Sequence, residues 1–311
     1  MSARALVTGV GGQDGSYLAE RLLADGLEVH ALTLASDGPP AYCPDGVVLH
    51  PGDVGDVEAT RRLVLEVAPT EVYNLAAVSS VAQSWDDPVR TAWVNGHAAV
   101  ALMESVRQVR GSRFVQASSA EVFGEPEESP QDESTPICPV NPYGAAKAYA
   151  HLSARVQRQR DQFVSSVVLY NHESPRRREQ FVTRKITSGV AAIARGEATE
   201  LVLGNLDARR DWGWAPDYVD AMVRAARSDV PADYVVATGT AHSVRELVAA
   251  AFTAAGVDDW EPLVRSDPAL FRPADPTELV GDSSRIREEL GWAPTVGFEE
   301  VVARMVAADL P

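Results

Sequence analysis

Short apolar runs alternate with amphipathic stretches through the first two thirds of the chain. The apolar runs have the length of buried strands, and the amphipathic stretches repeat with the period of a helix. This alternation predicts an α/β fold, in which helices wrap both faces of a doubly wound parallel sheet. The predicted strands are 5–8, 28–34, 47–50, 71–75, 113–117 and 165–170, and the predicted helices are 17–24, 57–67, roughly 91–110 and 143–162.

The character of the chain changes after Tyr170. A polar, basic stretch is followed by a helical pattern at 181–195, a stretch rich in charge and tryptophan at 207–216, and helical patterns near 244–255 and 283–290. No linker, repeat or low-complexity tract sets these segments apart. We therefore expect a smaller C-terminal substrate domain that is interleaved with the first domain. The expected ranges are 1–170 plus about 212–240 for the dinucleotide-binding domain, and about 171–211 plus 241–311 for the substrate domain.

The composition narrows the classes of partner. The net charge of −16 argues against a nucleic acid or an anionic membrane as partner, because either prefers a basic face. The six histidines and the cysteines Cys43 and Cys138 show no spacing typical of a metal site, so we expect no metal. Neither a signal peptide nor an apolar stretch of the roughly 18 residues that span a bilayer is visible. We expect a soluble, cytoplasmic protein.

Three glycines follow the first predicted strand. Gly9, Gly12 and Gly15 stand where that strand gives way to a helix, with Gln13 and Asp14 between them. Glycines at this spacing allow a tight turn and a close approach of backbone to a pyrophosphate that faces the helix N-terminus. The turn predicts a dinucleotide site of the Rossmann type.

Residues at the ends of later strands extend the predicted cofactor site. Asp53 is a candidate contact for the adenine ring or a simple turn residue. The second strand ends with neither the acid typical of NAD enzymes nor the arginine typical of NADP enzymes, but with the hydroxyls of Thr33 and Ser36. The candidates are Thr33, Ser36, Asp53, Val54, Leu75, Ala76 and Ala77.

A second group of polar residues follows the strand at 113–117. Ser119 and Glu121 lie just past its end, where open α/β folds place their chemistry. Tyr143 and Lys147 are four residues apart, hence on one face of a helix, and an ammonium near a phenol favours the phenolate that acts as a base. Glu121 could take a proton from a carbon beside a carbonyl, the step that precedes an elimination. Core packing for Tyr143 and a solvated loop position for Glu121 are the structural alternatives.

Long motifs give the chain a resemblance to a known family. It resembles the extended short-chain dehydrogenase/reductase family and, within it, the GDP-mannose 4,6-dehydratases, over nearly its whole length. The motifs are TGVGGQDGSYLAE at 8–20, YNHESPRR at 170–177, VTRK at 182–185, LGNLDARRDWG at 203–213, ATG at 237–239 and HSVRE at 242–246.

The resemblance implies a reaction and roles for the polar residues. Tyr143, assisted by Ser119 and Lys147, would take the proton of the sugar 4-hydroxyl while hydride passes from C4 to the nicotinamide. Glu121 would remove the C5 proton, water would leave from C6, and the hydride would return to C6. The substrate would be GDP-mannose or a close relative, and the product a GDP-4-keto-6-deoxy sugar.

The resemblance also implies binding residues and partners. Asn171, Lys185, Arg210 and Arg272 would hold the nucleotide diphosphate, and Asp275 the guanine or the ribose. Ser79 and Val182 complete the implied substrate site, together with Ser119 and Glu121. The implied cofactor is NADP, with NAD left open. A homodimer through the two long helices is expected, and a tetramer is the alternative.

Three departures from the family pattern keep alternatives open. Ala120 replaces the middle residue of a Thr-Ser-Glu motif, so Glu121 or water must help the C6 hydroxyl to leave. The loop after the second strand lacks the paired arginines that the family uses for the cofactor phosphate and a neighbouring subunit. The segments 77–85 and 271–279 resemble 4-keto-6-deoxymannose reductases. A reductase, an epimerase or a non-catalytic member therefore remain the alternative functions.

Overall fold

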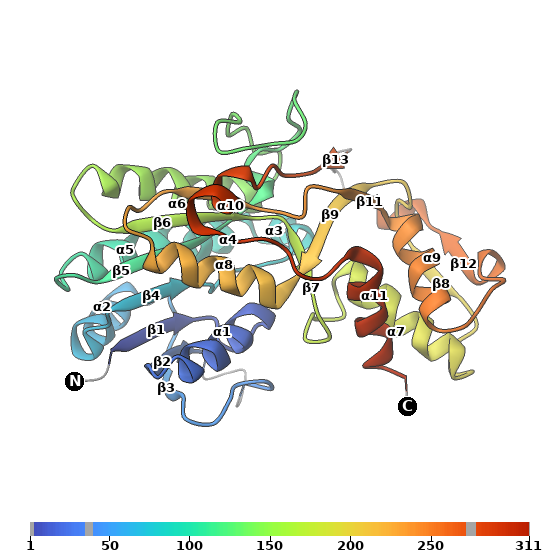
Figure 1. Ribbon diagram of the computed structural model, residues 1–311, viewed down its shortest axis with the longest axis horizontal. Helices are drawn as coiled ribbons and strands as arrows, with labels where there is room; N and C mark the ends of the chain where they lie inside the picture. Colours follow the sequence, from blue (N-terminus) through green and yellow to red (C-terminus); the bar gives the residue numbers. More distant parts are fainter. Residues whose placement is uncertain (1–2, 35–39, 272–277, 311) are drawn as a thin grey trace.

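A seven-stranded, all-parallel sheet forms the centre of the larger part of the molecule (Figure 1). The structure is a computed structural model that describes residues 3–34, 40–271 and 278–310. The strand order β10-β6-β5-β4-β1-β2-β3 confirms the predicted doubly wound fold, and all six predicted strands lie in it. The strands are β1 (Arg4–Thr8), β2 (Glu28–Thr33), β3 (Val48–Pro51), β4 (Glu71–Asn74), β5 (Arg113–Ser119), β6 (Val164–Leu169) and β10 (Asp233–Val236).

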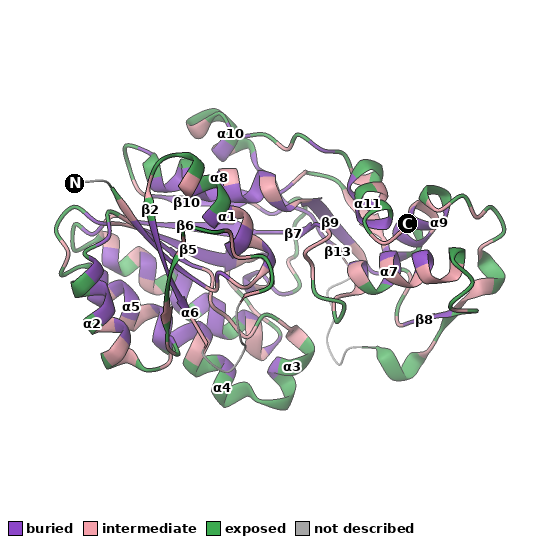
Figure 2. Ribbon diagram, turned by 90° about the horizontal axis from the view of Figure 1, so that it is seen from below, coloured by how far each residue is buried: buried purple, intermediate pink, exposed green. Residues whose placement is uncertain are grey.

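Helices cover both faces of this sheet. Leu18 and Met222 are fully buried between one face and its helices, and Val64 and Leu102 lie in the core on the other face. Figure 2 shows the strands buried almost throughout, while the helices turn exposed sides to solvent. The first face carries α1 (Gln13–Ala24), α8 (Ala215–Arg227) and α10 (Ser284–Leu290), and the second carries α2 (Val57–Val67), α5 (Ala99–Val106) and α6 (Pro142–Arg158).

The helix predicted at 91–110 is interrupted. The chain runs from α4 (Pro88–Ala92) through a π-helical turn, η2 (Trp93–Ala98), into α5. In this turn the Asn95 side chain accepts a hydrogen bond from the Val78 N–H (2.8 Å) and donates one to the Val78 carbonyl (3.0 Å). The turn thus fixes the loop that follows β4, a contact that no local pattern reveals. The second long helix ends at Arg158 rather than at 162. The helices α3 (Val81–Asp86), α8 and α11 (Phe298–Ala307) were not predicted.

A smaller region lies beside the carboxyl ends of the large sheet. Its four-stranded sheet combines β7 (Asn171–Glu173), β9 (Arg209–Trp214), β11 (Ala241–Ser243) and β13 (Glu278–Leu279). Strands β8 (Leu201–Leu203) and β12 (Val264–Ser266) pair separately, and α7 (Val182–Ala194), α9 (Val244–Ala254) and α11 (Phe298–Ala307) pack together around Trp212 and Phe252. Short 3₁₀ turns are η3 (Ala120–Val122), η4 (Glu261–Leu263) and η5 (Pro268–Leu270).

The chain passes between the two regions more than once. After β9 it returns to the large sheet for α8 and β10, and then leaves again for β11 and α9. This path agrees with a smaller C-terminal region interleaved with the large sheet, while the exact ranges of the two domains stay a prediction. Within the described ranges, no helix combines the length and the apolar character needed to cross a membrane.

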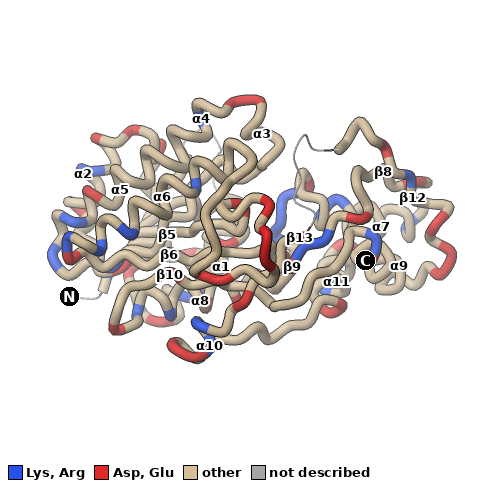
Figure 3. Tube along the Cα trace, turned by 90° about the horizontal axis from the view of Figure 1, so that it is seen from above, with Lys and Arg blue, Asp and Glu red and all other residues tan. Residues whose placement is uncertain are grey.

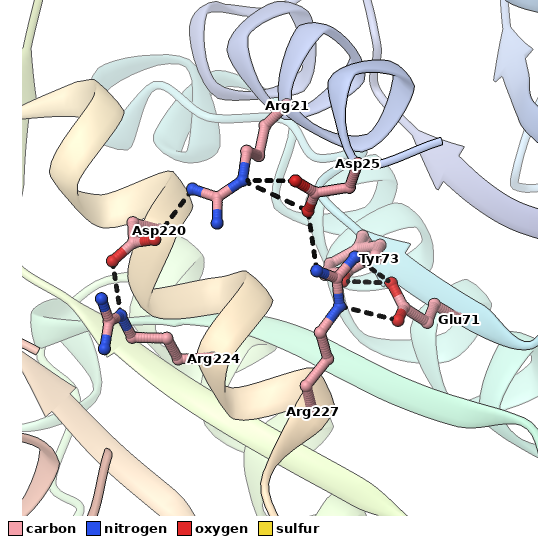
Figure 4. Close-up of polar contacts among 7 residues, drawn as sticks. All are labelled: Arg21, Asp25, Glu71, Tyr73, Asp220, Arg224 and Arg227. Carbon is pink, nitrogen blue, oxygen red and sulfur yellow. Dashed lines mark hydrogen bonds and ion pairs between the residues drawn. The ribbon is translucent and has the colours of Figure 1, made fainter. Parts of the chain in front are cut away.

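A polar network ties α1, β4 and α8 together (Figure 4). Arg227 donates to Asp25 (2.7 Å) and to Glu71 (2.9 Å), and Glu71 also accepts the hydroxyl of Tyr73 (2.8 Å). The Tyr73 side chain is fully buried, so Glu71 is the partner that keeps its hydroxyl satisfied. Outer members of the network are Arg21, Asp220 and Arg224.

We expect Glu71→Ala to lower the free energy of unfolding by about 1–3 kcal/mol, because it leaves the buried Tyr73 hydroxyl without its acceptor. Urea denaturation measures this change. Glu58→Ala is a matched control, since Glu58 forms only an exposed pair with Arg61 and should cost at most about 1 kcal/mol. Adding Tyr73→Phe to Glu71→Ala should recover part of the loss; no recovery would contradict the explanation.

Candidate functional site

A cavity of about 510 Å³ lies over the carboxyl ends of β1, β2 and β4. Open α/β sheets bind ligands at this position, where the strand order reverses. Most of the residues predicted to bind the cofactor line it: Gly9, Gly12, Gln13, Asp14, Gly15, Thr33, Asp53, Val54, Leu75, Ala76 and Ala77. Tyr143 and Lys147, which are predicted to contact the cofactor as well as to act in catalysis, are not among its lining residues. Ser79, predicted for the substrate, lines it as well, and Ser36 lies outside the described residues.

Glycine is required at two points of the turn. Gly9 has a φ of +79°, and a Cβ there would come within 2.9 Å of the Ala76 nitrogen. A Cβ at Gly15 would lie 2.3 Å from the Gly9 carbonyl oxygen. Thr8 joins the ends of β1 and β4 at the same place, because its hydroxyl donates a hydrogen bond to the Asn74 side chain (2.7 Å). Helix α1 then begins without a side-chain cap, so its first N–H groups can receive a phosphate.

Asp53 has a structural role as well as a place in the cavity wall. Its carboxylate accepts the Gly55 N–H (2.8 Å), which shapes the turn after β3. Asp53 is therefore a turn residue, and its place in the cavity wall is compatible with the predicted contact to an adenine ring.

The start of α1 is bound to β7 by polar side chains. Gln13 donates to the His172 carbonyl (3.0 Å) and accepts the Ser174 hydroxyl (2.8 Å). The His172 ring donates from Nδ1 to the Tyr170 carbonyl (2.7 Å), and its Nε2 lies 2.9 Å from the Asp14 carboxylate. Since both ring nitrogens face acceptors, the ring is an imidazolium. The glycine turn and the smaller region are thus joined by a buried ion pair.

The charge states of this pair follow from its surroundings. Burial opposes the charge on His172, but the attraction of Asp14 and its hydrogen bond outweigh burial and raise the pKa of His172. Burial likewise works against ionisation of Asp14, and His172 reverses the effect, so the pKa of Asp14 is lowered. Each group therefore favours the charged form of the other.

Ser119, Tyr143 and Lys147 come together at the end of β5. Burial raises the pKa of Tyr143 to about 12, against the effect of its hydrogen bond with Ser119. Burial lowers the pKa of Lys147 to about 8, and its ammonium donates to the Ala117 carbonyl (2.8 Å), 5.8 Å from the centre of the Tyr143 ring. Asp14 opposes the effect of burial on the pKa of Lys147, so the glycine turn lies within electrostatic reach of Lys147. With a pKa of about 12, the Tyr143 side chain is a neutral phenol at neutral pH in the unliganded protein.

Glu121 is the middle residue of η3, the short turn that begins directly after Ser119. Its carboxylate accepts a hydrogen bond from the Asn141 amide (2.7 Å), and its charge adds to the effect of burial on the pKa of Tyr143. The sequence analysis did not identify Asn141. An asparagine before proline at the start of a helical pattern is a capping signal. This signal would have identified Asn141 as a helix cap, but not its hydrogen bond to Glu121.

The residues predicted for the nucleotide diphosphate gather in the smaller region. Asn171 lies in β7 and Arg210 in the neighbouring β9, where Arg210 is 6% exposed. Val182 is the first residue of α7, and Lys185 is exposed in its first turn. Figure 3 shows basic residues around β9, between the large sheet and α7. Arg272 and Asp275 lie outside the described residues.

The cavity wall also contains residues that the sequence analysis did not assign to it. Arg90, Tyr42, Phe181 and the run 176–178 all line it. Arg176 stacks on Tyr17 (3.9 Å to the ring centre) and donates to Ser16 (3.0 Å), which secures this run against α1. In an acidic chain, four arginines at one cavity favour a ligand that carries phosphate.

Two further observations concern packing and metals. Trp212 is buried against Phe298 (6.0 Å between ring centres), so it packs the smaller region. Across the residues that the structure describes, no group of three or more histidine, cysteine, aspartate or glutamate side chains is arranged to hold a metal ion.

Comparisons with known proteins give a consistent result. A family described as "GDP-mannose 4,6 dehydratase" matches residues 6–305. GDP-mannose 4,6-dehydratase of Vibrio cholerae is 39% identical over 100% of this chain and 94% of its own, and GDP-mannose 4,6 dehydratase 1 of Arabidopsis thaliana is 43% identical over 98% and 89%. The solved UDP-glucose 4-epimerase of Thermus thermophilus, in complex with NAD, is 32% identical, with a TM-score of 0.88 and 98% of both chains covered.

The pair of His172 and Asp14 makes stability depend on pH in a defined direction. A raised pKa in the folded state stabilises below the unfolded value of about 6.5, and this contribution is lost as pH rises through the folded value. We expect the difference in unfolding free energy between the wild type and His172→Gln to shrink above about pH 6.5, by up to about 1.4 kcal/mol per pH unit.

Urea denaturation at several pH values measures this difference. In an Asp14→Asn background, the effect of His172→Gln should lose this pH dependence, because the partner charge is absent. A difference that stays constant with pH in the wild-type background would contradict the charged pair.

Proposed function

Since the chain belongs to the GDP-mannose 4,6-dehydratase family, within the extended short-chain dehydrogenases/reductases, we propose that it removes water from GDP-mannose to form a GDP-4-keto-6-deoxy sugar. The activity is that of a hydro-lyase. The observation that carries the proposal is the match along almost the full length, which includes both the glycine turn and the segments of the smaller region.

The cavity fits a nicotinamide dinucleotide. The turn at Gly9 and Gly15 has no room for a Cβ, and the uncapped start of α1 faces the same space. When bound, the nicotinamide would accept hydride from the sugar C4 and return it to C6, so that none is consumed. Thr33 and Leu34 line the cavity at the end of β2 without offering a carboxylate for the ribose, and arginines stand nearby, which favours NADP over NAD.

Tyr143 and Ser119 would act on the 4-hydroxyl. Ser119 and Tyr143 share a hydrogen bond, so both can contact one substrate oxygen. Because burial raises the pKa of Tyr143 to about 12, positive charge at the reacting centre is needed for it to act as a base. The Lys147 ammonium is the cation that α6 supplies, and a bound oxidised nicotinamide would add a second.

Glu121 would act on C5 and C6. Its carboxylate takes the C5 proton once C4 is a ketone, and the resulting acid can give a proton to the departing C6 hydroxyl, so that water leaves. Return of the hydride to C6 would be accompanied by return of a proton to C5. Protons removed from O4 and C5 thus balance those given to the hydroxyl and C5. Ala120 has no hydroxyl that could help the C6 hydroxyl to leave, which supports this assignment to Glu121.

A homodimer is the proposed assembly. The outer surface of α4, η2 and α6 carries large apolar side chains that are about half exposed or more, namely Val89, Trp93, Tyr149 and Val156. A monomer seldom leaves such a set of neighbouring side chains in water. Arg90 of α4 and Val94 of η2 line the cavity, so the proposed interface lies beside it.

Incubation of the purified protein with GDP-mannose tests the function. With NADP⁺ added, or with cofactor that remains bound through purification, we expect the sugar nucleotide to lose one water without accumulation of reduced nicotinamide. Parallel reactions with NAD⁺ and with no addition identify the cofactor. Mass spectrometry and nicotinamide absorbance are the measurements. An unchanged mass in all reactions would favour a reductase or an epimerase, to be tested with the 4-keto-6-deoxy nucleotide and NADPH.

Glu121→Gln tests the proposed base. Dehydration should fall by about 10²–10⁴-fold, the range of a general acid–base residue, while oxidation at C4 continues and reduced nicotinamide becomes visible. Glu127→Gln is a matched control, because Glu127 is exposed a few residues further along the same loop. Full dehydration by the Glu121 variant would remove this residue from the mechanism.

A further inference from the structure

Asn141 uses both ends of its side-chain amide. It precedes α6, where its Oδ1 accepts the Gly144 N–H (2.8 Å) as the helix N-cap. Its Nδ2 donates to the Glu121 carboxylate (2.7 Å). The side chain is buried, with 5% exposed, so water does not compete for either contact.

We infer that Asn141 is the positioning residue for Glu121, and that it keeps this carboxylate oriented and ready to accept a proton; the inference rests on the proposed function. The cap fixes which way the amide faces, because only an oxygen can accept the Gly144 N–H. The amino group must then face Glu121, where it occupies Oε2 and leaves Oε1 for the substrate. Of the side chains that commonly cap helices, only asparagine carries its acceptor and its donor on two separate atoms.

The backbone around Asn141 restricts Glu121 further. A Cβ at Gly144 would lie 2.4 Å from the Glu121 carbonyl oxygen, so the first turn of α6 is pressed against η3. Tyr143 stands between Asn141 and Gly144, and its N–H donates to the Ser84 hydroxyl (3.2 Å). The two groups proposed to remove protons are therefore held by one rigid turn.

Aspartate and serine can replace Asn141 as helix caps, but neither can donate a hydrogen bond to Glu121 as asparagine does. Aspartate keeps the cap and the size of the side chain, but places a second carboxylate against Glu121. Two carboxylates at hydrogen-bond distance share a proton, so the pair could no longer act as a free base at neutral pH. Serine keeps a cap but is too short to reach Glu121.

The test compares Asn141→Asp and Asn141→Ser in the dehydration of GDP-mannose. For Asn141→Asp we expect kcat to fall about 10²-fold or more at neutral pH, and the acid limb of the pH–rate profile to move to higher pH. For Asn141→Ser we expect a loss of about 10-fold with the acid limb in place. In both, KM should change little and reduced nicotinamide should build up, because C4 oxidation does not need Glu121.

Controls separate positioning from folding. Asp56→Asn makes the reverse exchange at the exposed cap of α2 and should leave activity unchanged. In a Glu121→Gln background, Asn141→Asp should add little further loss, because the residue acts through Glu121. Retention of cofactor and an unchanged unfolding midpoint would show that the variants are folded.

The possible results distinguish this inference from the function on which it rests. If the wild type removes no water from GDP-mannose, the proposed function fails. If the wild type is active and Asn141→Asp has the same rate and pH profile, Asn141 is only a helix cap and the inference is overturned. Additive losses in the double variant would overturn it as well.

Discussion

The close approach of two strand ends is the constraint on which the site depends. The turn after β1 and the loop after β4 touch backbone to backbone at Gly9 and Ala76, and the Thr8 hydroxyl bridges them. This contact leaves no room for a side chain at Gly9. The chain turns there from β1 into α1, and the cavity lies over this turn. Every other element of the site is positioned relative to this junction.

Polar contacts extend this constraint into the smaller region. Gln13 and Asp14, inside the turn, hold β7 through His172 and Ser174. The YNHESPRR motif at 170–177 therefore also supports the glycine turn. A reaction in which hydride leaves and returns to the same sugar needs both ligands in fixed relation, and this joint between the regions provides a physical basis for it.

The sequence predicted the parts of the fold and site that depend on local order. Alternating runs identified the sheet, and the glycine spacing identified residues that line the cavity. What could not be predicted depends on which distant segments meet. Asn141 is visible as a cap, but its bond to Glu121 requires η3 to lie against α6. Nothing in the sequence distinguishes His172 from the other five histidines, because its partner Asp14 lies 158 residues away along the chain. The catalytic and binding roles, including those of Ser36, Arg272 and Asp275, stay predictions.

The interleaved path has a consequence for how such proteins diversify. The chain leaves the large sheet after β6, returns for α8 and β10, leaves for β11 and α9, and returns for α10 before it ends in α11. No single cut separates the part that surrounds the cofactor cavity from the smaller region. Recombination at one junction cannot transfer a new substrate region onto this sheet, so new specificity must arise by point substitutions or by exchange of several short segments together.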